Sequence, residues 1–177
     1  MTDNDNERGR YFILGTIDGV LAILGIIVGI SSTALDPDII IRAALGGGIA
    51  LCLTNGIGSY LAESAVEYGK LSSVERALLQ DLKDTRLEKM TKKKIFLDSI
   101  AHGGSSLVGS IIPILPFLFL EGFDAVIWSI ALSLSSLVVL GLYSGKISRQ
   151  SYIKSVVRMV ALGALIVIVC SLLGLEH

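Results

Sequence analysis

An aspartate inside an apolar stretch is the first residue of this chain that could do chemistry. Asp18 interrupts an otherwise apolar run that begins at Tyr11. It follows Arg10 at a spacing that places it about 12 Å along a helix. At that depth in a membrane, an ionisable side chain costs at least about 2.5–3.5 kcal/mol and usually faces a cavity, a partner or a transport path. The alternative is a protonated Asp18 that is hydrogen-bonded to a neighbouring helix.

A second polar set repeats every four residues and forms one stripe if the segment is helical. The set consists of Asn55, Ser59, Glu63 and Glu67. If the helix leaves the membrane near Ser64, Asn55 lies about as deep as Asp18, and the two glutamates stand at the cytoplasmic mouth. Oxygen ligands that lead from a mouth to a buried carboxylate suit a divalent cation. A solvated helix end would explain Glu67 equally well.

Two further groups carry possible metal ligands. Asp98 and His102 lie four residues apart at the start of a later apolar stretch, so they share a helix face. Carboxylate plus imidazole suits Fe, Mn or Zn, although a buried Asp–His hydrogen bond without metal is an equal alternative. In a polar segment before them, Asp81, Asp84 and Glu88 share one side of a predicted helix and could collect cations. The favoured interpretation of these three is a solvated face with Lys and Arg interleaved.

Long apolar stretches must position these residues. The chain of 177 residues is 52% hydrophobic and 18% charged, whereas soluble domains are about 25% charged. About 20 mostly apolar residues cross a bilayer as a helix. Five stretches qualify, at about 11–35, 39–66, 95–120, 125–143 and 155–173. The sequence therefore predicts an all-α integral membrane protein, one transmembrane domain over 1–177.

The only sizeable polar piece is predicted to be a cytoplasmic helical segment at 67–94, which returns to the membrane through Lys92–Lys94. Five spans place 14 of the 15 basic residues on one side, leaving Arg42 on the other. Since Lys and Arg collect on the cytoplasmic side of membrane proteins, the N-terminus is predicted in the cytoplasm and the C-terminus outside.

Several functional classes lack support in the sequence. A net charge of −1 gives no basic excess for binding nucleic acid. No nucleotide-binding, zinc-protease or hydrolase motif occurs, so nothing argues for an enzyme or a tightly bound cofactor. Glycines are four apart on the first span, at Gly15/Gly19 and Gly25/Gly29, and Gly46–Gly48, Gly56 and Gly58 crowd the second. This pattern predicts close packing of the first two spans or a dimer seam.

Four stretches resemble the vacuolar iron transporter family, which includes the plant and yeast vacuolar Fe2+/Mn2+ importers. Ile17-Asp18-Gly19 is similar to the family's Asn-Asp-Gly start, and residues 54–62 (TNGIGSYLA) resemble its Ser-Met-x-x-Gly stretch. Residues 103–117 (GGSSLVGSIIPILPF) resemble its Gly…Pro-x-x-Pro stretch, and residues 141–174 its last two helices joined by a basic loop.

The resemblance implies a homodimer that exchanges a divalent metal for protons across the membrane, out of the cytoplasm. Asp18 would stand at the family's mid-membrane metal and proton carboxylate. The chain departs from the family in three places. Asn55 replaces a membrane Met, Ser59 stands where many members have Glu (Glu63 could substitute), and the long Glu- and Met-rich cytoplasmic domain is reduced to a helix-sized segment.

The leading hypothesis is a proton-coupled Fe2+/Mn2+ exporter in a prokaryotic plasma membrane, with membrane lipid, metal ions, protons and a second copy of the chain as its partners. One alternative is a structural or interaction protein of the same fold that does not transport. Another is a transporter of a harder cation, Mg2+ or Ca2+, because every intramembrane ligand candidate except His102 offers oxygen.

Overall fold

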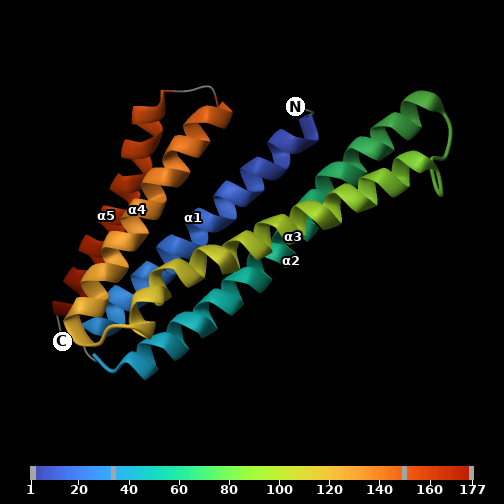
Figure 1. Cartoon of the computed structure of the whole chain (residues 1–177). Helices are drawn as coiled ribbons and strands as arrows, with labels where there is room; N and C mark the ends of the chain where they lie inside the picture. Colours follow the sequence, from blue (N-terminus) through green and yellow to red (C-terminus); the bar gives the residue numbers. More distant parts are fainter. Residues whose placement is uncertain (1–2, 33–34, 149–150, 176–177) are drawn as a thin grey trace.

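The computed structural model describes residues 3–32, 35–148 and 151–175. This part of the chain forms helices and contains no strand. The elements are α1 (Asp3–Ser31), α2 (Pro37–Leu78), α3 (Arg86–Ile114), the short 3-10 helix η1 (Leu115–Leu118), α4 (Gly122–Ser148) and α5 (Tyr152–Leu175) (Figure 1). Five of them are long and apolar enough to cross a membrane. The predicted all-α fold with five membrane helices is confirmed.

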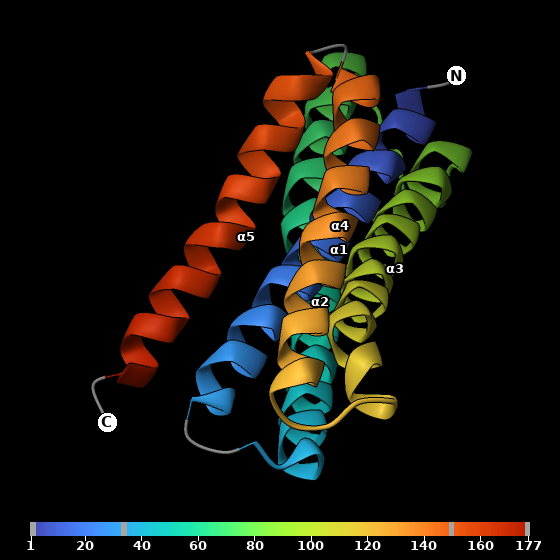
Figure 2. The same cartoon turned by 60° about the vertical axis from the view of Figure 1, so that its left-hand side comes forward.

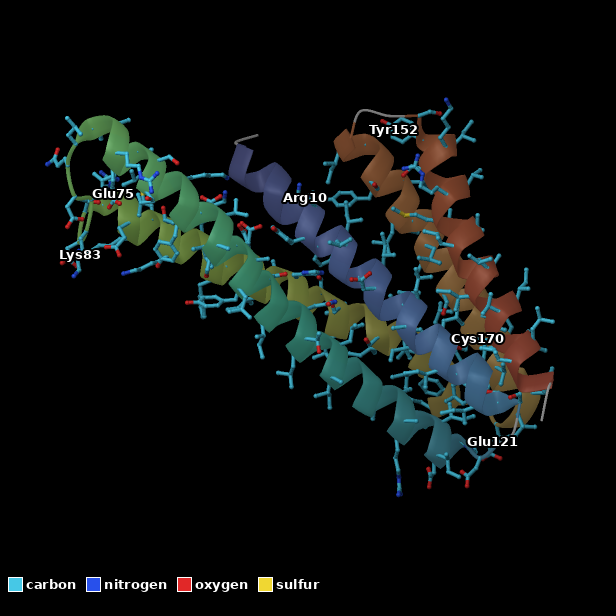
Figure 3. All side chains as sticks on the ribbon, turned by 180° about the vertical axis from the view of Figure 1, so that it is seen from behind. Arg10, Glu75, Lys83, Glu121, Tyr152 and Cys170 are labelled. Carbon is cyan, nitrogen blue, oxygen red and sulfur yellow. The ribbon has the colours of Figure 1, made fainter. Side chains whose placement is uncertain are left out.

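The helices form two antiparallel pairs with α1 between them. The pairs are α2 with α3 and α4 with α5, and α1 packs most extensively on α3 (Figures 1 and 2). The start of α1, the α2–α3 turn and the α4–α5 connection lie toward one end of the molecule. Figure 3 shows Arg10, Lys83 and Tyr152 toward this end and Glu121 and Cys170 toward the opposite one.

The two long helices of the α2–α3 pair end at a defined turn. At the start of α2, the Asp36 side chain accepts a hydrogen bond from the Asp38 amide at 2.9 Å, which satisfies one of the free donors at a helix start. α2 stops where Leu79 adopts a left-handed conformation (φ 51°), a common way to end a helix. The Thr85 side chain then accepts from the Glu88 amide at 3.4 Å and caps the start of α3.

This turn divides the predicted cytoplasmic segment between the end of α2 and the start of α3. The chain reverses direction at residues 79–85, whereas Lys92–Lys94 lie inside α3. The helix stop at Leu79 and the cap at Thr85 thus come before the basic run, and α3 carries Lys92–Lys94 on toward the predicted third span. α2 has 42 residues, which is about 63 Å of helix against a hydrocarbon thickness of about 30 Å. The α2–α3 hairpin is therefore long enough to extend well beyond a bilayer.

Glycines set how closely the helices approach. A Cβ on Gly19 of α1 would lie 2.7 Å from the Ser110 amide nitrogen of α3, and a Cβ on Gly109 would lie 2.9 Å from the Thr16 Cα. Gly103 of α3 would likewise meet the Cys52 carbonyl of α2 at 2.7 Å. Small residues at such positions let helix backbones touch in a membrane.

These contacts correct the predicted role of the first helix's glycines. Gly15 and Gly19 pack on α3 within one protomer, so they are neither an α1–α2 seam nor a dimer seam. Gly25 faces α5, where its Cβ would lie 3.4 Å from Ile166, and a Cβ on Gly29 would have no neighbour within 4 Å. The rotation of α1 decides this, because it turns the Gly15–Gly19 face toward α3.

An apolar core fills the end opposite the hairpin turn. It is built from buried side chains of α1, α2, α3, η1 and α4, namely Ile23, Ile27, Ile40, Ala44, Ile114, Phe117, Ala125 and Val126. The polar side chains described below lie on the hairpin side of this core. The two halves of the bundle therefore differ in chemistry.

Candidate functional site

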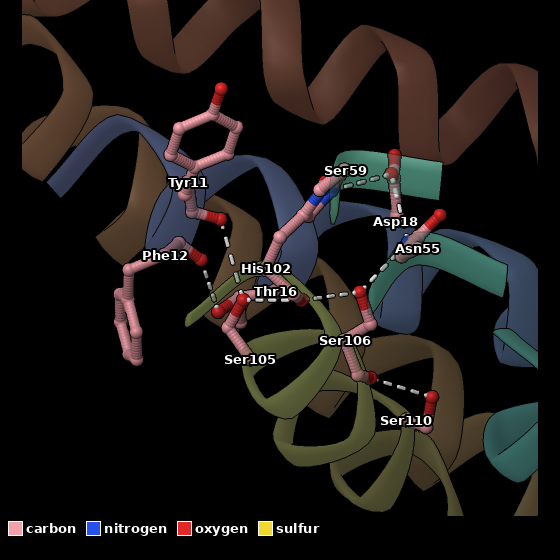
Figure 4. Close-up of polar contacts among 10 residues, drawn as sticks. All are labelled: Tyr11, Phe12, Thr16, Asp18, Asn55, Ser59, His102, Ser105, Ser106 and Ser110. Atoms are coloured by element: carbon pink, nitrogen blue, oxygen red, sulfur yellow. Dashed lines mark hydrogen bonds and ion pairs between the residues drawn. The ribbon is translucent and has the colours of Figure 1, made fainter. Parts of the chain in front are cut away.

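Three helices bring polar side chains together around Asp18. The carboxylate of Asp18 comes from α1, the carboxamide of Asn55 from α2 and the hydroxyl of Ser106 from α3 (Figure 4). Asn55 Nδ2 donates to Ser106 Oγ at 2.8 Å and lies 3.4 Å from Asp18 Oδ2. The close α1–α3 approach at Gly19 holds these side chains within reach of one another.

His102 of α3 joins the same group. Its Nε2 lies 3.7 Å from Asp18 Oδ2, and its Nδ1 is hydrogen-bonded to the hydroxyl of Ser59 on α2 (Figure 4). Asp18, Asn55, Ser59, His102 and Ser106 are called the Asp18 cluster below. The structure thus unites Asp18, Asn55, Ser59 and His102, which belong to three separate motifs in the sequence, with Ser106, which was not among the predicted site residues.

Burial differs sharply within the Asp18 cluster. The His102 side chain is 11% exposed, and Ser59 and Ser106 are buried. The Asp18 side chain, by contrast, is 41% exposed within the single protomer. One side of the carboxylate therefore contacts its polar neighbours, and the other side is accessible from outside the protomer.

Tyr11 and Glu63 continue the row of polar side chains from the Asp18 cluster toward the hairpin end. This row is called the polar line below. The Tyr11 hydroxyl donates to a carboxylate oxygen of Glu63, one turn along α2 from Ser59. The Tyr11 ring also lies 5.7 Å from the His102 ring, centroid to centroid. Tyr11 was not among the predicted site residues. Its spacing of seven from Asp18, two helical turns on one face, is the signal that could have identified it.

Glu67 and Asp98 have different surroundings. Glu67 accepts from Lys70 at 2.6 Å and from Lys94 of α3 at 3.2 Å, so its charge is balanced by two ammonium groups. Asp98 is only 1% exposed. The predicted Asp98–His102 pair shares a helix, but the imidazole contacts Asp18 and Ser59 on two other helices.

The acidic residues near the turn do not share one helix face. Asp81 and Asp84 lie in the turn and Glu88 lies in the first turn of α3. Asp81 accepts from the Lys83 amide at 2.9 Å, and Glu88 accepts from the Asp84 amide at 2.8 Å. Glu88 also pairs with Lys92 at 2.7 Å. Asp81 and Glu88 therefore accept from backbone amides at the turn, and Glu88 also pairs with Lys92, because the helix break at 79–85 interrupts the predicted helix.

The Asp18 cluster holds one carboxylate and one imidazole. Among the residues that the structure describes, no three His, Cys, Asp or Glu side chains are grouped as a metal site. A metal ion bound at Asp18 would therefore also need amide, hydroxyl or water oxygens. Hard and borderline divalent ions accept such mixed sets.

Comparison with known proteins identifies the family. The sequence profile of the VIT family matches residues 9–94 and 69–175. An uncharacterized protein of Methanocaldococcus jannaschii is 34% identical over 172 residues, which cover 96% of this chain and 90% of the relative. A VIT-like transporter 1b of Glycine max is 24% identical over 153 residues, which cover 84% of this chain and 67% of the relative.

The two profile matches overlap at residues 69–94, which make up most of the α2–α3 hairpin outside the spans predicted from the sequence. The membrane helices on both sides of this segment are matched by the profile. The chain is an integral membrane protein that belongs to the VIT family, a family of membrane metal-ion transporters.

Proposed function

We propose that this protein moves a divalent transition metal, Fe2+ or Mn2+, out of the cytoplasm in exchange for protons. The observation that carries the proposal is the half-open Asp18 carboxylate, held mid-helix beside Asn55 and His102. A bound cation favours the ionised carboxylate, whereas a proton neutralises it. Metal and proton therefore exclude each other at Asp18, which is a sufficient physical basis for exchange.

The polar line supports entry of the metal to Asp18 from the hairpin side. Glu63 and Tyr11 stand at the mouth, and Ser59 and His102 lead from them to Asp18. Beyond Asp18 the apolar core closes the other half of the bundle. This arrangement supports a state that is open toward the hairpin end and closed toward the other. Release on the far side then requires the packing of α1 against that core to change.

The hairpin end faces the cytoplasm. Support comes from the 14 of 15 Lys and Arg residues that belong to the N-terminal segment, to residues 67–94 and to residues 145–158, since such residues collect on the cytoplasmic side. The membrane is a prokaryotic plasma membrane, a proposal that the archaeal relative supports.

A reporter enzyme fused after the last residue tests this orientation. Alkaline phosphatase, which is active only outside the cytoplasm, should be active in this fusion, because five spans bring the C-terminus to the outer face. The matched fusion carries the same enzyme in the turn, after Lys83, and should be inactive. The opposite pattern would overturn the proposed orientation.

A second copy of the chain covers the open side of Asp18. An exposed carboxylate facing lipid is unfavourable, so a polar partner is expected there. Beside Asn55, α2 presents small, exposed residues at helical spacing: Thr54, Gly58, Ala62 and Ala65. Such a surface allows close helix approach. The proposed assembly is a C2 dimer with both Asp18 residues near its axis.

Gly58→Leu is expected to shift this dimer toward monomer while the protomer stays folded. A Cβ at Gly58 would meet no atom within 4 Å in the protomer, so the substitution is expected to act on a partner. Gly104→Leu on α3 is the matched control, since its Cβ would be equally unobstructed. Native mass spectrometry in mild detergent measures both. Wild-type protein that is monomeric at every concentration would contradict the dimer.

Flux measurements in proteoliposomes test the function itself. Vesicles with an imposed pH gradient are offered Fe2+, Mn2+, Ca2+ or Mg2+ in separate experiments, and internal metal and pH are recorded. The proposal expects Fe2+ or Mn2+ movement with opposite proton movement. Transport of Ca2+ or Mg2+ alone would indicate a transporter of harder cations. Movement of none of the four would favour a structural or interaction role.

A further inference from the structure

The imidazole of His102 has one nitrogen engaged and one directed at Asp18. Nδ1 is hydrogen-bonded to the Ser59 hydroxyl. Nε2 is buried and has no hydrogen-bond partner among the described residues, and it lies 3.7 Å from Asp18 Oδ2. A buried polar atom without a partner is unfavourable, so this one requires an explanation. Two explanations fit these contacts: Nε2 binds a metal ion, or it forms a loose ion pair with Asp18.

We infer that His102 Nε2 is a metal ligand together with Asp18, and that it selects transition metals over Mg2+ and Ca2+. The inference rests on the proposed function and names the cargo class of the same site. Imidazole nitrogen suits Zn, Cu, Fe and Ni, whereas Mg2+ and Ca2+ take oxygen ligands. His102 is thus the one imidazole in the Asp18 cluster, and it sets the preference for transition metals.

The geometry fits one ion shared by the two side chains. Ligand bonds from His nitrogen and carboxylate oxygen to a borderline divalent ion are about 2.0–2.2 Å long. Two ligand atoms 3.7 Å apart can therefore contact the same ion. The 41% exposure of the Asp18 side chain leaves room for additional oxygen ligands on its open side.

Ser59 acts as a positioning residue for His102. A metal-binding imidazole usually uses its second nitrogen in a hydrogen bond that fixes the tautomer and the ring orientation. When Nδ1–H donates to the Ser59 hydroxyl, Nε2 carries the lone pair that a metal needs. The Tyr11 ring, tilted by 42° beside the imidazole, covers another side of it.

Pulsed EPR of bound Mn2+ tests the assignment on the full chain in detergent. The chain has two histidines, His102 and His177, so a nitrogen coupling can be assigned without ambiguity. Mn2+ bound to the wild type should show electron spin-echo modulation from an imidazole nitrogen, and labelling with 15N-histidine should change that modulation. His177→Ala should keep the signal and His102→Gln should remove it. The labelled His177→Ala protein gives the answer even where His102→Gln fails to fold.

Metal competition provides a second readout. His102→Gln should lower the ratio of Mn2+ to Ca2+ affinity at least about 10-fold, and Ser59→Ala should weaken Mn2+ binding about 10-fold with the nitrogen signal retained. Bound Mn2+ that depends on Asp18 but shows no histidine coupling overturns the role of His102 and leaves the proposed transport intact. Mn2+ binding that does not depend on Asp18, or no binding at all, overturns both.

Discussion

Asp18→Asn is expected to abolish metal-driven proton movement while the protein stays folded. Asparagine keeps the size of the side chain but cannot exchange a proton for a metal ion, so the coupling group is lost. Folding should be affected little, because the Asp18 side chain is 41% exposed and its contact with Asn55 is long, at 3.4 Å. Proteoliposomes that contain a pH-sensitive dye and receive Mn2+ or Fe2+ measure the coupling directly.

Glu63→Gln is the matched control for this experiment. It also converts a carboxylate to an amide, but at the mouth, where Glu63 accepts a hydrogen bond from Tyr11. Its expected effect is a weaker apparent metal affinity with proton coupling retained. If Asp18→Asn carries Fe2+ or Mn2+ at the wild-type rate, the mechanism is wrong.

Gly19→Ala is expected to lower the free energy of unfolding by about 1–3 kcal/mol, the cost of overpacking a tight contact. The new methyl group would lie 2.7 Å from the Ser110 amide nitrogen and would also collide with the Ser106 carbonyl oxygen. Both atoms belong to the backbone of α3, so they cannot rotate away as a flexible side chain would. α1 must instead move away from α3, which also separates Asp18 from His102.

Gly29→Ala on the same helix should have the opposite sign. Its Cβ would meet no atom within 4 Å, so the intrinsic preference of helices for alanine remains, about 0.5–1 kcal/mol of stabilisation. Thermal unfolding of both variants in one detergent, followed by circular dichroism, makes the comparison. Equal stability of Gly19→Ala and wild type would contradict the close approach of α1 and α3.

Local properties of the sequence determined the membrane architecture. The length and hydropathy of each apolar stretch suffice to identify a spanning helix, because every backbone polar group must be satisfied inside its own segment. The four-residue spacing of Asn55, Ser59 and Glu63 likewise places them on one side of α2, and all three have polar partners from other helices. The family was also evident from short local motifs.

Contacts between helices were decided only by the tertiary structure. Sequence spacing paired His102 with Asp98 on its own helix, whereas the fold brings it to Asp18 and Ser59. Spacing gave Glu67 a place at the mouth, but Lys94 of α3 neutralises it. In each case a partner lies on another helix, although Glu67 also pairs with Lys70 of its own helix. The helix that supplies the partner depends on how the helices are rotated and on how closely their backbones approach. Glycines permit the close approach, but their contacts exist only in the packed structure.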